Sequence, residues 1–209
     1  MKKGLFISIE GLDGSGKSTQ VRYIQEYLHG RNIRTLLLRE PGGTKIGEKV
    51  RDILLDARNT EMDSVAEMLL YASSRAQIMA EKVIPALEDG ITVICDRFID
   101  SSIAYQGYGR ELDINEVYNV NYTAVRHILP DITFFLDQHP DTSLKRRKEA
   151  SKADRLENEK MEFHNRVYKG YKELCSRYPE RIKVLDAGES IEEIGEKITK
   201  HLESFLERM

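Results

Sequence analysis

A glycine-rich segment near the start of the chain is the strongest candidate for chemistry. Residues 11–18 read GLDGSGKS and satisfy the pattern G-x-x-x-x-G-K-[ST] in full. In such a loop, backbone N–H groups turn inward and cradle phosphate oxygens at the start of a helix. The pattern therefore predicts a triphosphate site in which Lys17 reaches the β- and γ-phosphates and the Ser18 hydroxyl binds Mg²⁺. The predicted ATP contacts are Gly11, Leu12, Asp13, Gly14, Ser15, Gly16, Lys17, Ser18 and Thr19. A glycine-rich turn with an N-cap serine is the alternative that needs no ligand.

A pair of charged residues follows an apolar run later in the chain. Residues 91–95 read ITVIC and lead directly into Asp96 and Arg97. If this strand lies beside the phosphate loop, Asp96 can bind Mg²⁺ through water, and Arg97 can clamp a neighbouring anion. Asp96 can instead cap the turn that follows it. Cys95 is expected to be a small buried hydrophobic residue.

Five short apolar runs, rich in β-branched residues, indicate the strands that position these groups. They cover residues 5–9, 35–38, 91–95, 132–136 and 182–185. Because the runs are continuous and not alternating, we expect strands that are buried on both faces. Stretches with helical spacing lie between them, so we predict an α/β fold with a parallel sheet covered by helices on both sides.

Three stretches carry the helical spacing most clearly. A long helix is expected over residues 62–87. The apolar residues predicted to face the core are Val21, Ile24 and Leu28 after the first strand, Met68, Leu69 and Ala72 in the long helix, and Ile191, Ile194, Ile198, Leu202 and Phe205 at the end of the chain.

The composition limits the class of protein. A chain of 209 residues with 40% hydrophobic and 32% charged residues predicts one globular domain. Its 32 Lys and Arg against 35 Asp and Glu argue against nucleic acid as the main partner. Two cysteines are too few for a disulfide framework, and no window approaches the ~18 apolar residues of a membrane span. We therefore expect a cytoplasmic protein that binds neither nucleic acid nor membrane.

Missing motifs narrow the class of phosphate-loop protein. The chain contains no Asn-Lys pair, so the N-K-x-D segment of a switch GTPase is absent from the sequence. The third apolar run ends in Asp-Arg, whereas a motor ATPase usually carries an Asp-Glu pair there.

Further motifs resemble the bacterial thymidylate kinase family, a member of the nucleoside monophosphate kinase group. They are REPGGT at residues 39–44, YASSR ending at Arg75, DRFIDSSIAYQGYGR at residues 96–110, and DRLE at residues 154–157. The resemblance runs to about Tyr171. It implies a three-layer P-loop kinase fold with a five-stranded parallel sheet, formed by residues 1–209 as one domain with a lid over about residues 145–157. It also implies that ATP, with Mg²⁺, phosphorylates dTMP to dTDP in a homodimeric enzyme.

The same resemblance implies an acceptor phosphate site. Arg39, Arg51 and Arg97 would hold the monophosphate, Glu40 would organise the site, and the adjacent Pro41 would also bind the substrate. Asp13 would lie near the acceptor phosphate and the metal, where it needs an arginine partner because an isolated anion would repel ATP. Without the resemblance, Arg51 is an ordinary arginine on a helix surface.

A base site is implied as well. Tyr71 stands where the family usually has a phenylalanine stacked on thymine, so the aromatic face is kept and a hydroxyl is added. Arg75 would donate to thymine O4, and Ser102 and Gln106 would engage N3–H and O4. Cytosine reverses donor and acceptor at that edge and would leave buried groups unpaired. Tyr105 would crowd the sugar 2′ position and disfavour ribonucleotides.

Several of these residues have simpler interpretations. A tyrosine on an apolar helix face, such as Tyr71, is more often a core residue. Ser101 and Ser102 can be helix caps. The basic run at residues 145–155 can be a solvated helix end and loop.

The lid is expected to supply a catalytic arginine. Some members of the family place that arginine in the phosphate loop, at the position filled here by Gly14. The candidates are Arg147, Lys152 and Arg155, of which Arg155 in the DRLE segment matches best. The predicted catalytic residues are thus Lys17, Asp13, Arg97 and Arg155. Two alternative functions remain open, a kinase for another pyrimidine monophosphate and a nucleotide-binding regulator without turnover.

Overall fold

A parallel sheet of five strands runs through the computed structural model, which describes residues 4–148 and 154–207. The strands lie in the order β2-β3-β1-β4-β5. Their bounds are β1 (Phe6–Glu10), β2 (Thr35–Arg39), β3 (Thr92–Asp96), β4 (Ile132–Asp137) and β5 (Ile182–Asp186). All five predicted strands are confirmed, with ends shifted by at most one residue. Because β3 pairs with β1, the segments that follow these two strands meet at one edge of the sheet.

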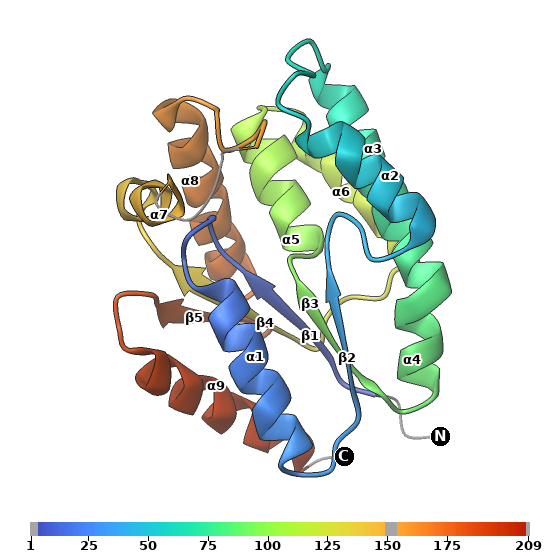
Figure 1. Cartoon of the computed structure of the whole chain (residues 1–209), viewed down its shortest axis with the longest axis vertical. Coiled ribbons are helices and arrows are strands. Elements are labelled where there is room, and N and C mark those ends of the chain that lie inside the picture. Colours follow the sequence, from blue (N-terminus) through green and yellow to red (C-terminus); the bar gives the residue numbers. More distant parts are fainter. Residues whose placement is uncertain (1–3, 149–153, 208–209) are drawn as a thin grey trace.

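Helices cover both faces of this sheet, as the α/β prediction required (Figure 1). Helices α1 and α9 share one core cluster with β1 and β4, and α3, α5, α6 and α8 pack on the opposite face. The helices are α1 (Lys17–His29), α2 (Lys45–Leu55), α3 (Ser64–Ile78), α4 (Ile84–Glu88), α5 (Ile99–Ser102), α6 (Ile114–Ala124), α7 (Pro140–Lys148), α8 (Met161–Arg177) and α9 (Ile191–Leu206), with π-helical turns η1 (Met79–Val83) and η2 (Ile103–Gly109).

The burial prediction holds for the three inner strands and is wrong for the two outer ones. Strands β1, β3 and β4 are buried along almost their whole length, and Cys95 is fully buried as expected. On the outer strands β2 and β5, Leu37 and Val184 are 40% and 47% exposed. An outer strand has a neighbour on one side only, so part of its surface faces solvent.

Most predicted helix stripes are confirmed, with two exceptions. Val21, Ile24 and Leu28 are buried, as are the central positions of α9. Leu69 is 48% exposed, because the buried face of α3 follows the i, i+4 pair of Met68 and Ala72 and Leu69 lies off that line. Ile191 is also exposed, since it is the first residue of α9.

The long helix predicted over residues 62–87 is three helical elements in succession. It begins at Ser64, where the Asp63 side chain accepts hydrogen bonds from the N–H groups of Val65 and Ala66. It continues through the π-helical turn η1 and ends at Glu88.

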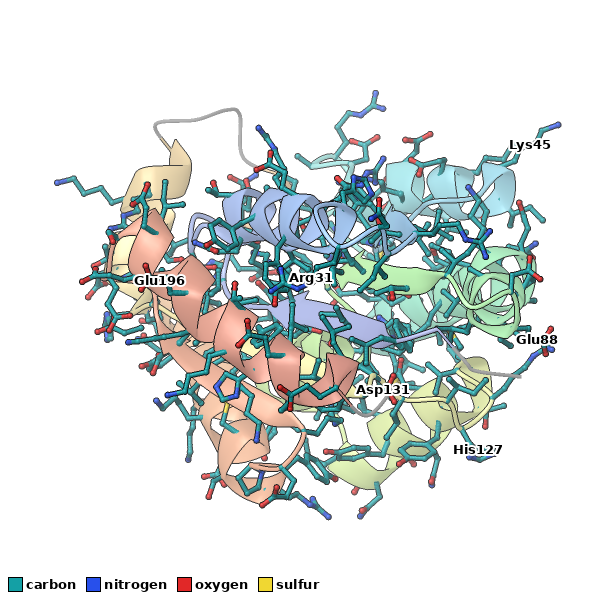
Figure 2. All side chains as sticks on the ribbon, turned by 90° about the horizontal axis from the view of Figure 1, so that it is seen from below. Arg31, Lys45, Glu88, His127, Asp131 and Glu196 are labelled. Atoms are coloured by element: carbon teal, nitrogen blue, oxygen red, sulfur yellow. The ribbon has the colours of Figure 1, made fainter. Side chains whose placement is uncertain are left out.

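Charged side chains project from the rim of the molecule on several sides, as Lys45 and Glu88 illustrate (Figure 2). Among the described residues, no helix is long and apolar enough to cross a membrane.

Candidate active site

The phosphate loop connects β1 to α1 and takes a backbone path that glycine permits. Gly11, Gly14 and Gly16 have φ angles of 145°, 86° and 94°, a region that other residues rarely adopt. A Cβ on Gly11 would lie 2.7 Å from the Ser15 hydroxyl oxygen, so this position also requires a close approach. The N-cap of α1 is Gly16, which has no side chain to cap the helix. The N-cap serine alternative is therefore wrong. The N–H groups of Thr19 and Gln20 donate to the Gly16 carbonyl oxygen, and those of Lys17 and Ser18, at the start of α1, are placed where a phosphate can accept from them.

Lys17 is folded back onto this loop. Its ammonium group donates to the carbonyl oxygens of Gly11 and Leu12, at 3.1 and 2.8 Å, and the residue is buried. Burial, together with the nearby Arg97 guanidinium, lowers the pKa of Lys17. An anionic phosphate beside the ammonium would raise this pKa again, so the position of Lys17 suits a phosphate ligand.

Ser18 and Asp96 face each other across the first turn of α1 and the end of β3. The Ser18 hydroxyl donates to an Asp96 carboxylate oxygen at 3.5 Å, and both residues line the same cavity. A hydroxyl beside a carboxylate suits Mg²⁺, which typically takes one or two protein oxygens and completes its shell with phosphates and water. No group of three His, Cys, Asp or Glu side chains gathers as a metal site within residues 4–148 and 154–207.

Arg97 lies between the phosphate loop and the far end of the cavity. Its φ of 69° is unusual for a residue with a side chain, and such strain is typical of functional sites. The guanidinium donates to Asp13 at 2.8 Å and to the hydroxyls of Ser101, Tyr171 and Tyr105 at 3.1, 3.2 and 3.3 Å. Burial alone would lower the pKa of Arg97, but the Asp13 carboxylate and the two tyrosines raise it. Asp13 therefore has the arginine partner that its predicted position demanded.

Glu10 supports this arrangement from the end of β1, and sequence reasoning missed it. Its carboxylate accepts from the Phe98 N–H at 2.7 Å and from the hydroxyls of Ser101 and Tyr171 at 2.6 and 3.0 Å. Burial, with a smaller contribution from Asp100, raises its pKa to about 7. The one available signal was an acidic residue that ends an otherwise apolar strand directly before the phosphate loop.

Arg39 and Arg51 converge at another wall of the cavity. Both guanidinium groups donate to the Pro41 carbonyl oxygen, at 3.2 and 2.9 Å, and Arg39 also pairs with Glu48 at 3.0 Å. Burial and the neighbouring Arg39 charge lower the pKa of Arg51. Two guanidinium groups beside one carboxylate leave excess positive charge, which a phosphate would balance.

Arg75 is buried at the opposite end, with all its N–H groups directed at protein acceptors. It pairs with Glu40 through Nε at 2.7 Å and through a terminal nitrogen at 2.6 Å. The other donors reach Ser102 at 2.8 Å, the side chain of Asn121, and the Phe98 carbonyl at 3.1 Å. A contact to thymine O4 would therefore have to compete with these partners, so the predicted role of Arg75 stays a prediction.

Ser101 and Ser102 do not cap α5, whose N-cap is Phe98. Ser101 joins Glu10 to Tyr171, and Ser102 accepts from Arg75. The π-helical turn η2 then continues from α5 and carries Tyr105 and Gln106, and such turns are frequent at functional sites.

One cavity of about 490 Å³ connects these groups. It is lined by every residue predicted to bind the acceptor nucleotide, namely Arg39, Glu40, Pro41, Arg51, Tyr71, Arg75, Arg97, Ser102, Tyr105 and Gln106. Asp13, Gly14, Gly16, Lys17, Ser18, Thr19 and Asp96 line it from the phosphate loop side, whereas Gly11, Leu12 and Ser15 do not. Tyr71 lines the cavity and also packs against the core, so the two interpretations of this residue describe one position.

Among the described residues of the basic run after β4, the arginine that reaches the cavity is not the predicted Arg155; Asp154 of the same run also lines the cavity. Arg146, on α7, lines the cavity. Arg155 does not: it is buried, donates to the Leu54 carbonyl at 2.9 Å, and lies 2.7 Å from a Glu67 carboxylate oxygen. Lys152 and the side chain of Arg147 lie outside the described residues.

Comparison with known proteins agrees with the arrangement of these residues. Residues 9–198 match the sequence profile of the family described as thymidylate kinase. The thymidylate kinase of Thermoanaerobacter sp. (strain X514) is 48% identical over 98% of this chain and 100% of its own length. That of Bacillus licheniformis is 43% identical over 97% of each chain. The crystal structure of thymidylate kinase from Ehrlichia chaffeensis superposes with a TM-score of 0.78 at 35% identity, covering 96% of this chain and 99% of that one.

Proposed function

The chain belongs to the thymidylate kinase family and phosphorylates dTMP to dTDP with ATP, and we propose that it does so in the cavity between the phosphate loop and Tyr71. The observation that carries this proposal is the continuity of the cavity. A triphosphate cradle lies at one end, an aromatic ring with polar neighbours lies at the other, and Arg97 contacts the cradle through Asp13.

In this proposal, the protein positions two polyanions and neutralises their charge. The acceptor is a phosphate with a second pKa of about 6, so it is mostly dianionic at pH 7 and needs no general base. Arg39 and Arg51 would bind that phosphate, and Arg97 would contact both it and the transferring group. Lys17 would stabilise the negative charge on the transferring phosphoryl oxygens, and the walls of the cavity would keep out water as a competing acceptor.

Ser18 and Asp96 would hold the magnesium ion that accompanies ATP. When bound, the ion would neutralise phosphate charge beside Lys17. Their hydroxyl and carboxylate oxygens, 3.5 Å apart at the cavity wall, support this assignment.

Two arginines of the basic run are candidates for the lid arginine. Arg155 remains the predicted residue, and Arg146 joins it because it lines the cavity. If Arg155 leaves Glu67 and contacts the transferring group during turnover, Arg155→Ala should lower kcat by at least about tenfold, as loss of a transition-state charge contact does. If Arg155→Ala leaves kcat intact while Arg146→Ala lowers it, the charge comes from α7 instead.

A coupled assay of ADP release, with dTMP, dUMP, dCMP and thymidine in turn, tests the function. We expect turnover with dTMP and none with thymidine, which lacks the acceptor phosphate. Preferred turnover of dCMP would favour a kinase for another pyrimidine nucleotide, and ATP binding without any turnover would favour a regulator. A single domain with a lid over about residues 145–157, a homodimer and a cytoplasmic location stay predictions; analytical ultracentrifugation would test the homodimer.

A further inference from the structure

Glu67 is a buried carboxylate that lies outside the cavity but contacts one of the residues that line it. It belongs to α3, one helical turn before Tyr71, and its side chain is fully buried. One of its oxygens, Oε1, accepts from the Gln106 amide nitrogen at 2.9 Å and more weakly from Arg110 Nε at 3.3 Å. The other, Oε2, accepts from Arg110 at 2.9 Å and lies 2.7 Å from Arg155. The proposed function gives Glu67 no role.

The chemistry of the carboxylate determines which way the Gln106 amide faces. A glutamine side chain carries a donor and an acceptor, and can in principle present either one. An ionised carboxylate can only accept, so it holds the NH₂ group of Gln106 and turns the amide oxygen away from itself. The two guanidinium groups on Oε2 supply the positive charge that an ionised buried carboxylate requires. The orientation of the amide is therefore fixed by charge.

Because Glu67 holds the amide nitrogen of Gln106, the amide oxygen is the group that can bind a ligand. Gln106 lines the cavity, and its Oε1 is buried without a hydrogen-bond partner among the described residues. A buried acceptor without a partner is uncommon in native proteins and often marks a site completed by a ligand. Thymine and uracil present a donor at N3, whereas N3 of cytosine is an acceptor. An acceptor held at this point suits the first two bases and repels the third.

We propose that Glu67 is a positioning residue for base selection, which fixes the Gln106 amide so that its oxygen accepts N3–H of the acceptor pyrimidine. This inference rests on the proposed function, since it requires the base to occupy the Tyr71 end of the cavity. Glu67 touches no substrate and acts only through Gln106.

Replacing the carboxylate by an amide should reverse the polarity of the contact. In Glu67→Gln, the shorter guanidinium contacts, from the Arg110 terminal nitrogen and from Arg155, attract the new amide oxygen to the Oε2 side, whereas Oε1 has only the longer Arg110 Nε contact at 3.3 Å. This orientation leaves an NH₂ group facing Gln106. Gln106 would then turn its oxygen toward residue 67 and its NH₂ toward the base. We expect the ratio of kcat/KM for dTMP to that for dCMP to fall by about tenfold or more, the usual cost of a mismatched buried hydrogen bond. The KM for ATP should not change.

Two variants separate this effect from a general loss of the ion pairs among Glu67, Arg110, Arg155 and Glu159. Glu159 pairs with Arg110 on the same cluster but makes no hydrogen bond with Gln106, so Glu159→Gln is the matched change. Glu67→Asp keeps a carboxylate that can only accept. Both should retain the wild-type preference for dTMP over dCMP, whatever they do to Tm. An equal loss of preference in Glu159→Gln and Glu67→Gln would overturn the proposal, and so would an unchanged ratio in Glu67→Gln.

Gln106→Leu keeps the proposal testable if Glu67→Gln does not fold. It removes the amide oxygen and should lower the ratio of kcat/KM for dTMP to that for dCMP by about tenfold or more; an unchanged ratio would overturn the proposal. The wild-type protein distinguishes the two levels of inference. If it does not turn over dTMP, the proposed function fails, whereas discrimination by the wild type that persists in the variants means that only the role of Glu67 fails.

Discussion

The two ends of the cavity are built from different parts of the chain. The triphosphate end is one continuous stretch, residues 11–18, in which positive-φ glycines shape the loop and backbone amides form the predicted phosphate cradle. The base end depends on side chains: Arg75 of α3 is held by Glu40 after β2, by Ser102 of α5 and by Asn121 of α6. Substitutions at the first end should therefore change catalysis and spare the fold, whereas substitutions at the second should change both.

The largest effect is expected at the triphosphate end. Lys17→Met removes the ammonium group but keeps the apolar stem, so transfer should fall by at least about 10³-fold, since a preorganised charge contact to the transferring phosphoryl group is lost. In the structure this ammonium donates to backbone carbonyls of its own loop and lies 3.8 Å from the Asp13 carboxylate of the same loop. All these contacts lie within the phosphate loop, so Tm should change little. Stopped-flow and steady-state assays measure the rate of phosphoryl transfer, and thermal unfolding measures Tm. Turnover within tenfold of wild type, or a large drop in Tm, would break the contrast between the two ends.

Arg75→Ala is the corresponding change at the base end. It leaves the Glu40 carboxylate buried without its cation, and breaking a buried pair in this way costs about 3–5 kcal/mol of unfolding free energy. The kcat/KM for dTMP should fall far more than the KM for ATP rises. Urea unfolding and two-substrate kinetics check these expectations. The control is Arg31→Ala, whose exposed pair with Glu203 should contribute less than about 1 kcal/mol.

Equal losses toward dTMP and ATP in Arg75→Ala would remove the base-reading role. A loss of stability no larger than that of Arg31→Ala would show that the buried pair does not hold the base end together.

The same contrast explains what could be predicted from the sequence. The phosphate loop was predictable in detail because its conformation follows from eight consecutive residues, and the strands were predictable because their apolar runs are continuous. The sequence could not predict that protein acceptors take all the N–H groups of Arg75, since these acceptors lie far apart in the chain, at residues 40, 98, 102 and 121. The resemblance supplied the residue types at the base end, but not which protein group each one binds.

The site residues that the sequence did not predict also depend on contacts between distant segments of the chain. Glu10 and Glu67 belong to no motif of the sequence, and their importance comes from which helices pack over them. Arg146 and Arg155 lie in one basic run, and only the path of α7 decides that the first of them reaches the cavity. Charge runs predict a basic segment but not which member faces a ligand.

Glu10 lies where the two ends meet and offers a pH-dependent test. Its folded-state pKa of about 7 exceeds the ordinary value of 4.5, so the folded state binds the proton more tightly than the unfolded state. Its contribution to stability is therefore present below about pH 4.5 and is lost as the pH rises through about 7, an effect on the order of 3 kcal/mol. Glu10→Gln should flatten the profile of Tm against pH in this window.

Thermal unfolding of both proteins from pH 4.5 to 8 measures this difference. Glu203→Gln, at an exposed glutamate, serves as the control and should keep the wild-type slope. Parallel profiles for wild type and Glu10→Gln would contradict the raised pKa of Glu10.

The smallest effect is expected for Tyr71→Phe, which tests whether the base end reads this residue by its ring or by its hydroxyl. Burial, with a smaller contribution from Glu67, raises the pKa of Tyr71 above its ordinary value, so the substitution removes no charge at neutral pH. If stacking on the base is the role of the ring, kcat/KM for dTMP should change by less than about threefold, as expected for a change that costs under ~0.7 kcal/mol. Tyr71→Ala should cost about tenfold or more, because it removes the aromatic face as well. A large loss in Tyr71→Phe would mean that this wall of the cavity, like the Arg75 cluster behind it, depends on a specific hydrogen bond.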